Sequence, residues 1–217
     1  MSKISYRHES PIGRIPISKV TPVVDGGRWP AKAFQGEVIP FSAVVFREGH
    51  DALGVEVLLT SPTGKSSTLR MHPGAPGSDS WHVRALLSEI GEYKFSVRAF
   101  GDDYETWHHN AQVKLEVGVD EELMMLEGVA LFARAAAEKT RSKENAKQLV
   151  AIAELLGDAS KSAQDRFASI DSVDLKKVLF DEPIRSIVTL SDEYVIKCER
   201  EYAGAAAWYE FFPRSEG

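Results

Sequence analysis

The sequence has a single cysteine, Cys198, so no disulfide bond can form within the chain. Its 217 residues are enough to bury a core without such cross-links. Disulfides persist mainly in oxidising compartments, so this composition favours a reducing cytoplasm. Cys198 lies on an expected strand with no plausible histidine partner nearby, and we interpret it as an inert thiol.

Excess positive charge and long apolar runs are also missing. The formal net charge is −6, which argues against nucleic acid and anionic membrane surfaces as partners. No stretch approaches the roughly 18 apolar residues that a membrane-spanning helix requires. The first residues, MSKISYRHESPIGRIPI, contain no long apolar run, so we expect no signal peptide.

Common catalytic and cofactor motifs are absent from the sequence. It contains no GxGxxG before a helix, no GxxxxGK, no HExxH, no CxxC and no GxSxG. We therefore expect no cofactor, no metal and no catalytic residue from motifs alone.

Alternating apolar residues dominate the segment from about Ile12 to Val117. The alternation is clearest in four stretches, at Val55–Leu59, Trp81–Ala85, Tyr93–Ala99 and Gln112–Val117. A period of two predicts antiparallel strands with one buried face. Val38–Phe46 is apolar on both faces, as expected of a central strand. Turn residues at 61–64 and 73–79 separate the strands, and the spacing favours an immunoglobulin-like sandwich.

The pattern becomes helical near Val119. Asp120 is a plausible N-cap, and the helix formers DEELMMLEGVALFARAAAE follow it. Leu149, Ile152, Ala153 and Leu156 have helical spacing, and Gly157 provides a stop. We expect a third helix capped by Ser160 and a fourth over 174–180.

Strand patterns return after Pro183, at Tyr194–Cys198 and Ala205–Phe212. The simplest interpretation is an α+β fold in which an immunoglobulin-like antiparallel β-sandwich carries an inserted helical bundle. We expect the sandwich to comprise residues 1–118 and 184–217, and the insertion to comprise 119–183.

Two polar clusters are candidates for chemistry. GDDYETWHH, at 101–109, offers acids and histidines for a metal site or an acid/base pair, or it is a polar hairpin turn. His108 and His109 would point to opposite faces of a strand, which favours the turn. REGHD, at 47–51, is either a site or a solvated turn, and we favour the turn.

A third candidate is the loop that contains Arg28, Trp29 and Lys32 after two glycines. An aromatic ring flanked by cations suits sugar stacking and phosphate binding. The alternative is that Trp29 covers one end of the sandwich core.

The stretch VVDGGRWPAKAFQGEVIPFSAVVFREGHDALG resembles the N-terminal region of bacterial maltosyltransferases of the α-amylase superfamily. The family pattern has PVVD, then G-RYPAK, GE and VFREGHD, and here Trp29 replaces the commoner tyrosine. YETWHH at 104–109 and AAWYEFFPRSEG at 206–217 are also similar to the family. The resemblance spans nearly the whole chain and is weakest in the helical part.

This resemblance implies an accessory and dimerisation segment of an enzyme that transfers maltosyl units from maltose 1-phosphate to α-1,4-glucans. The family's nucleophile and general acid belong to a (β/α)₈ barrel that would begin after Gly217, and no carboxylate pair here matches them. The resemblance also implies a homodimer. We expect Arg28, Trp29 and Lys32 to support the donor-binding region or an interface.

Three other functions remain open. A free-standing α-glucan-binding module would need an exposed aromatic platform, for which Trp29, Trp81 and Trp107 are candidates. A general interaction domain is compatible with the composition. An autonomous enzyme would have to use the cluster at 102–109.

Overall fold

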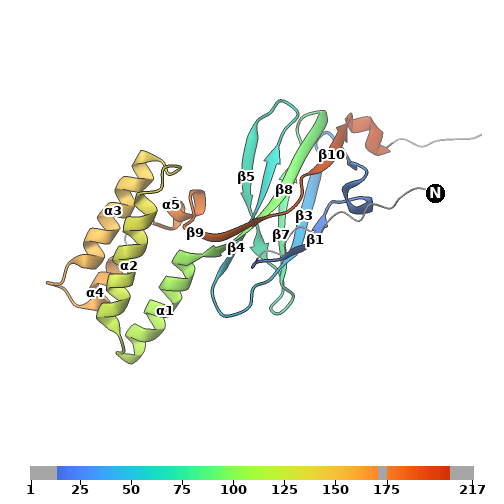
Figure 1. The fold of residues 1–217 in the computed structure, drawn as a ribbon. Helices are drawn as coiled ribbons and strands as arrows, with labels where there is room; N and C mark the ends of the chain where they lie inside the picture. Colours follow the sequence, from blue (N-terminus) through green and yellow to red (C-terminus); the bar gives the residue numbers. More distant parts are fainter. Residues whose placement is uncertain (1–13, 171–174, 206–217) are drawn as a thin grey trace, which may run out of the picture. The chain divides into compact units, whose positions relative to one another are not determined.

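The computed structural model describes residues 14–170 and 175–205 (Figure 1). Its strands are β1 Ile17–Thr21, β2 Ala31–Phe34, β3 Val38–Val45, β4 Leu53–Thr60, β5 Ser66–Arg70, β6 His72–Pro73, β7 Ser80–Leu86, β8 Gly91–Asp102, β9 Arg185–Leu190 and β10 Tyr194–Glu199. Its helices are α1 Asp103–Val117, α2 Glu121–Ala136, α3 Lys143–Gly157, α4 Ala163–Ile170 and α5 Leu175–Asp181. This combination of sheets and helices confirms the expected α+β class.

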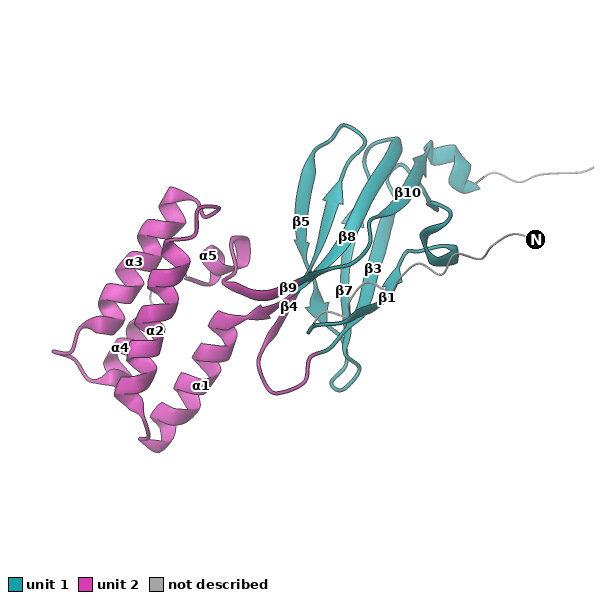
Figure 2. Ribbon diagram, viewed as in Figure 1, with its two compact units in different colours: residues 1–46, 55–99, 189–217 teal, residues 47–54, 100–188 magenta. Residues whose placement is uncertain are grey.

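The chain forms two compact units (Figure 2). The first, which we call the sheet unit, comprises residues 1–46, 55–99 and 189–217. The second, the helical unit, comprises residues 47–54 and 100–188 and contains the five helices. The chain passes from one unit to the other between Phe46 and Arg47 and within β4, β8 and β9.

The strands form one sheet of four and one sheet of six. The first has the order β1-β3-β7-β6, and the second has the order β2-β10-β8-β4-β5, with β9 also paired to β8. β10 runs antiparallel to β8 but parallel to β2, where Ile196 pairs with Ala31. The expectation that all strands would pair antiparallel was therefore wrong for β2 and β10.

The core of the sheet unit follows from the alternation along its strands. In β3, Ile39, Phe41, Ala43 and Val45 are buried, while Val38 and Pro40 on the opposite face are exposed. β3 lies between β1 and β7, as a central strand should, but only one of its faces is buried. The rings of Phe41 in β3 and Phe95 in β8 meet edge to face at 5.0 Å, so the two sheets share buried aromatic contacts.

The helical unit has its own apolar core. It includes Trp107 of α1, Met125 and Phe132 of α2, and Leu149 and Ile152 of α3, all of them buried. The indole Nε1 of Trp107 donates a hydrogen bond of 2.9 Å to the carbonyl of Met124. Burying this side chain therefore leaves its polar atom satisfied.

The strand expected over Gln112–Val117 is instead the end of α1. The side chain of Asp102 caps the start of this helix, and Gly118 ends it in the left-handed conformation with φ of 68°. Tyr104, Trp107 and Ala111 are buried at helical spacing. Val113 and Val117, expected to be buried in a strand, are exposed on the helix.

The helices after α1 lie close to their expected positions. Two of the residues expected to cap them do not do so. Asp120 precedes α2, but its side chain caps no backbone group. Its carboxylate pairs instead with Lys114 at 3.1 Å. Before α4 the hydroxyl of Ser162, rather than Ser160, accepts the amide hydrogen bond. The strand expected over 205–212 lies outside the described residues apart from Ala205, which ends a 3₁₀ turn, Glu201–Ala205. No helix in the described ranges is long and apolar enough to cross a membrane.

Candidate functional site

The loop between Val24 and Trp29 is tightly wound. Asp25, Gly26 and Gly27 have φ values of 47°, 63° and 90°, and Val24 pairs with Trp29 across the turn. A Cβ atom on Gly27 would lie 2.9 Å from the ring of Tyr194. Glycine is therefore required at position 27 both for the backbone conformation and for the close approach of that ring.

This loop presents Trp29 to solvent. The Trp29 side chain is 59% exposed, which is incompatible with its covering the end of the core. The Arg28 guanidinium carbon lies 5.6 Å from the centre of the indole ring, within the range of a cation–π contact. Asp25 is the ion-pair partner of Arg28, at 3.9 Å. The loop therefore offers an exposed ring and an exposed cation.

Lys32 forms an ion pair with Glu199. Its Nζ lies 2.9 Å from Oε1 of Glu199, and both residues line a pocket of about 400 Å³ with Phe34, Glu37 and Gly204. The hydrogen bond from Lys32, and then that from Lys197, hold the pKa of Glu199 below its ordinary value. Arg28 and Trp29 do not line this pocket, so the three predicted residues do not converge there.

The GDDYETWHH cluster straddles the end of β8 and the start of α1 and is not a hairpin turn. Asp102 is buried as the N-cap, and Asp103 pairs with Arg134 of α2. The ring of His108 stacks on Phe167 at 4.9 Å, whereas His109 is exposed. These residues cap the start of α1 and make packing contacts in the helical unit.

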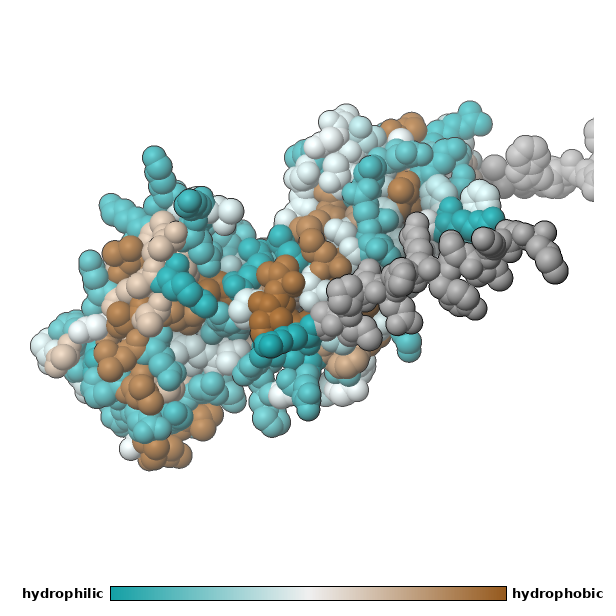
Figure 3. All heavy atoms as spheres, viewed as in Figure 1, coloured by the Kyte–Doolittle hydropathy of each residue, from teal (hydrophilic) through white to brown (hydrophobic). Residues whose placement is uncertain are grey.

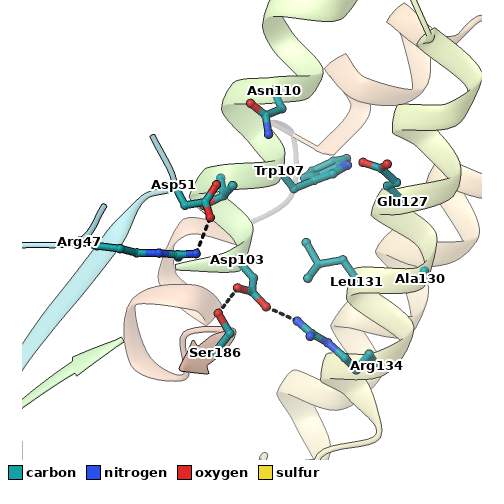
Figure 4. A pocket seen from close by; sticks show the side chains of 11 residues that line it. Arg47, Asp51, Asp103, Trp107, Asn110, Glu127, Ala130, Leu131, Arg134 and Ser186 are labelled. Atoms are coloured by element: carbon teal, nitrogen blue, oxygen red, sulfur yellow. Dashed lines mark hydrogen bonds and ion pairs between the residues drawn. The ribbon is translucent and has the colours of Figure 1, made fainter. Parts of the chain in front are cut away.

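REGHD is a polar loop before β4. Arg47 and Asp51 form an ion pair at 2.6 Å, while Glu48 and His50 are exposed. The loop contributes to a groove of about 430 Å³ in the helical unit, which we call the helical groove (Figure 4). The groove is lined by Arg47, Asp51, Asp103, Thr106, Trp107, Asn110, Glu127, Ala130, Leu131, Arg134 and Ser186.

Most charges in the helical groove are already paired. Asp103 accepts hydrogen bonds from Arg134 and from the Ser186 hydroxyl, each at 2.5 Å, as the dashed lines in Figure 4 show. The Ser186 hydroxyl is bonded to a carboxylate rather than to a histidine, and neither His108 nor His109 lines the groove. The lining residues therefore suit binding or helix positioning better than nucleophilic catalysis.

The helical groove was not predicted from sequence, because the residue pattern indicated a turn and a strand where α1 lies. Asp103, Trp107 and Asn110 are spaced by four and three residues, which is helical spacing. Recognising this spacing would have placed them on one face. The groove residues on α2 include Arg134, which pairs with Asp103, and Glu127, and they carry no local signal of a site.

A metal site with three or more protein ligands and thiol chemistry both find little support in the described residues. Within the described ranges, no group of three or more histidine, cysteine, aspartate or glutamate side chains is placed to hold a metal ion. Cys198 is buried in β10, and burial, with a smaller contribution from Glu37, raises the pKa of its thiol. A raised pKa disfavours the reactive thiolate.

Comparisons with known proteins agree with the family resemblance of the sequence motifs. The profile of the family described as alpha-1,4-glucan:maltose-1-phosphate maltosyltransferase, domain N/S, matches residues 13–200. The chain is 42% identical to alpha-1,4-glucan:maltose-1-phosphate maltosyltransferase 1 of Streptomyces coelicolor over 217 residues, which is 100% of this chain and 32% of that protein.

More distant relatives match over similar lengths. The chain is 32% identical to the maltosyltransferase of Mycobacterium tuberculosis strain H37Rv, over 94% of this chain and 32% of that protein. It is 36% identical to that of Corynebacterium pseudotuberculosis, over 94% of this chain and 31% of that protein. The chain thus spans about a third of the length of these relatives. It belongs to the alpha-1,4-glucan:maltose-1-phosphate maltosyltransferase family, where it corresponds to domain N/S.

Proposed function

We propose that this chain is the N-terminal accessory segment of an enzyme that transfers maltosyl units from maltose 1-phosphate to α-1,4-glucans. The observation that carries the proposal is the match of the N/S-domain profile to residues 13–200. In this proposal the catalytic centre lies in the part of the enzyme that this chain does not include.

We further propose that the sheet unit is an immunoglobulin-like sandwich and that the helical unit is an insertion in it. In support, the chain enters the helices from β8 and returns through β9, two strands of the same sheet. The contact between Phe41 and Phe95 supports the packing of one sheet on the other.

The activity is tested by comparing the full-length polypeptide with the 217-residue chain. Each is incubated with maltose 1-phosphate and glycogen, and the released inorganic phosphate is measured. We expect phosphate release and glucan elongation from the full-length protein and neither from the chain alone. Turnover by the chain alone would contradict the absence of a catalytic centre, and inactivity of the full-length protein would contradict the assigned reaction.

A role in homodimerisation is the second part of the proposal. Several apolar side chains around the turn between α1 and α2 are exposed: Val113, Val117, Val119, Leu123 and Leu126. Apolar residues reach the surface of the helical unit in Figure 3 as well. Exposed apolar groups of this kind favour burial against a partner.

Sedimentation of the full-length protein tests this role. Leu126→Glu places a charge among these side chains and should shift the protein toward monomers. Val150→Glu, at a 46% exposed position on α3, is the matched control and should leave the dimer intact. A monomeric native protein, or equal effects of both variants, would refute the role of this surface.

We also propose that the loop with Arg28 and Trp29 supports donor binding or an interface in the full-length enzyme, with Lys32 holding β2 against Glu199. The exposed ring with its neighbouring cation supports this role. Trp29→Ala should raise the KM for maltose 1-phosphate or weaken the dimer, whereas Tyr202→Ala, at an 80% exposed aromatic, should do neither. Unchanged kinetics and assembly in a Trp29→Ala, Lys32→Ala variant would rule the role out.

A free-standing α-glucan-binding module is the alternative that the exposed Trp29 favours. The other candidate rings are less available, because Trp81 is only partly exposed and Trp107 is 6% exposed. Retention of the isolated chain on immobilised amylose, lost in Trp29→Ala, would support this alternative. Passage of the native chain without retention would exclude it.

A further inference from the structure

The outward face of the four-stranded sheet carries a row of polar side chains that crosses all four strands. Thr21 of β1 pairs with Ser42 of β3, Ser42 with His82 of β7, and His82 with His72 of β6. Directly paired residues project from the same face of a sheet. His72 and His82 therefore project from the same face on neighbouring strands, and both histidines are exposed.

A chain of hydrogen bonds orients the His82 ring. The Ser78 hydroxyl donates to the carbonyl of Ala75 at 2.6 Å and lies 2.7 Å from the Ser80 hydroxyl. The Ser80 hydroxyl in turn lies 3.1 Å from Nε2 of His82. With Nε2 engaged in this way, Nδ1 is the His82 nitrogen that remains for another ligand.

Gly74 makes room for this arrangement. A Cβ atom at that position would lie 2.2 Å from the Ser80 hydroxyl oxygen and 3.1 Å from Nε2 of His82. A larger residue would therefore displace the serine and disturb the ring that it orients. The glycine and the two serines thus set the position of the His82 ring on the β6–β7 hairpin, where His72 is its directly paired neighbour.

We propose that His72 and His82 together bind a divalent transition-metal ion, preferring Cu²⁺ over Ni²⁺ and Zn²⁺. Neutral imidazole is a common ligand for these ions, and an oriented second nitrogen strengthens such ligation. Directly opposed residues have Cβ atoms about 5 Å apart, which lets two imidazoles reach one ion. The proposal is independent of the maltosyltransferase assignment.

The surroundings indicate a site of moderate affinity. No third protein ligand joins the histidines in the described residues, so water would complete the coordination sphere. Arg84 follows His82 by two residues on the same face and adds a positive charge that weakens cation binding. Such an ion would exchange readily and would fasten β6, a strand of only two residues, to β7.

Copper titration of the untagged, metal-free 217-residue chain tests the proposal, with electron paramagnetic resonance as the readout. The expected spectrum shows hyperfine coupling to two imidazole nitrogens at one equivalent of Cu²⁺. His72→Ala and His82→Ala should each weaken binding by about 10- to 100-fold, because chelation by two tethered ligands is lost. His109→Ala, at an exposed histidine on α1, is the control and should bind like the native chain.

The Ser80→Ala variant distinguishes a site that requires an oriented His82 ring from one formed by two independent surface imidazoles. It keeps both histidines and removes the hydrogen bond to His82, and a severalfold loss of affinity is expected. A His72→Ala, His82→Ala double variant that bound Cu²⁺ as tightly as the native chain would overturn the site. Coupling to only one nitrogen in the native spectrum would also overturn it.

Discussion

Gly128 of α2 lies against the indole of Trp107. A Cβ atom at position 128 would lie 2.5 Å from Cζ2 of Trp107 and 2.9 Å from Cδ1 of Leu156. Real Cβ atoms do not approach this closely, and both neighbouring side chains are in the packed core of the helical unit. The absence of a side chain at this position therefore sets how closely α1, α2 and α3 approach one another.

Gly128→Ala should destabilise the chain by about 1–2 kcal/mol. Overpacking costs about 1–3 kcal/mol, and the higher helix propensity of alanine offsets up to about 1 kcal/mol. Gly157→Ala is the matched control, because its Cβ would meet Val129 at an ordinary 3.7 Å. The stability of both variants is measured by urea unfolding. Equal urea midpoints would show that the core accommodates a methyl group at position 128 without loss of stability.

The ion pair of Lys32 and Glu199 makes the stability of the folded chain depend on pH in the acid range. Hydrogen bonds from Lys32 and Lys197 hold the pKa of Glu199 below its ordinary value in the folded chain. The stabilisation is therefore fully present above the unfolded-state pKa of about 4.3 and is lost as the pH falls through the folded-state pKa.

In Lys32→Met the unfolding free energy should therefore fall less steeply as the pH drops below about 4.3. Lys94→Met is the control, because Lys94 pairs with Glu193 in a mostly exposed ion pair. Unfolding by urea at several pH values between neutral and acid compares the three proteins. An unchanged acid profile in Lys32→Met would mean that the pair does not shift the titration of Glu199.

At the scale of elements, Arg141 joins the end of α2 to the segment that follows α5. Its side chain is 1% exposed, and it donates hydrogen bonds to the carbonyls of Ala135, Glu182 and Pro183. Each of these carbonyls would lose a partner without the guanidinium. Arg141 thus hydrogen-bonds both to the end of α2 and to a second chain segment about 40 residues later in the sequence.

Arg141→Met should destabilise the chain by about 3 kcal/mol, because it leaves buried carbonyl groups unpaired. Arg134→Met removes another ion-paired arginine of the helical unit, but one whose side chain is 55% exposed. That control should cost less than about 1 kcal/mol. Stability is measured by thermal unfolding. If the two variants lost similar stability, the cost in Arg141→Met could not be assigned to the burial of Arg141.

Elements with a strong local period were predictable from sequence, whereas those set by distant partners were not. The apolar spacing at Leu149–Leu156 predicted α3, and the alternation at Tyr93–Ala99 predicted much of β8. In α1 the valines at 113 and 117 fit both a strand and the exposed side of a helix, so the period alone did not discriminate. The parallel pairing of β2 with β10 leaves no trace in either segment.

The candidate site was less predictable than the fold for the same reason. Arg28 and Trp29 were recognised as neighbours in sequence, and they are neighbours in the loop. The partner of Lys32, Glu199, is 167 residues away, and the partner of Asp103, Arg134, lies on another helix. Such pairings follow from tertiary packing, which no local pattern encodes.

At the scale of the whole molecule, the two units have separate cores, and damage to one should be visible locally. In Arg141→Met we expect faster amide hydrogen exchange in α2, α3 and α5, with exchange in β3 and β7 unchanged. Mass spectrometry of peptic fragments, with Arg134→Met alongside, makes the comparison. Uniform acceleration across both units would show instead that they unfold as one cooperative body.

The pairing of β2 with β10 also bears on how the chain is made on the ribosome. Ala31 is translated long before its partner Ile196, and at about 5–20 residues per second the wait is on the order of 10 s. During that interval the helices, whose contacts are more local, have time to form, while β2 has no β10 to pair with. A nascent chain at this stage exposes an unfinished sheet edge, and molecular chaperones that shield such edges would act before Glu199 emerges.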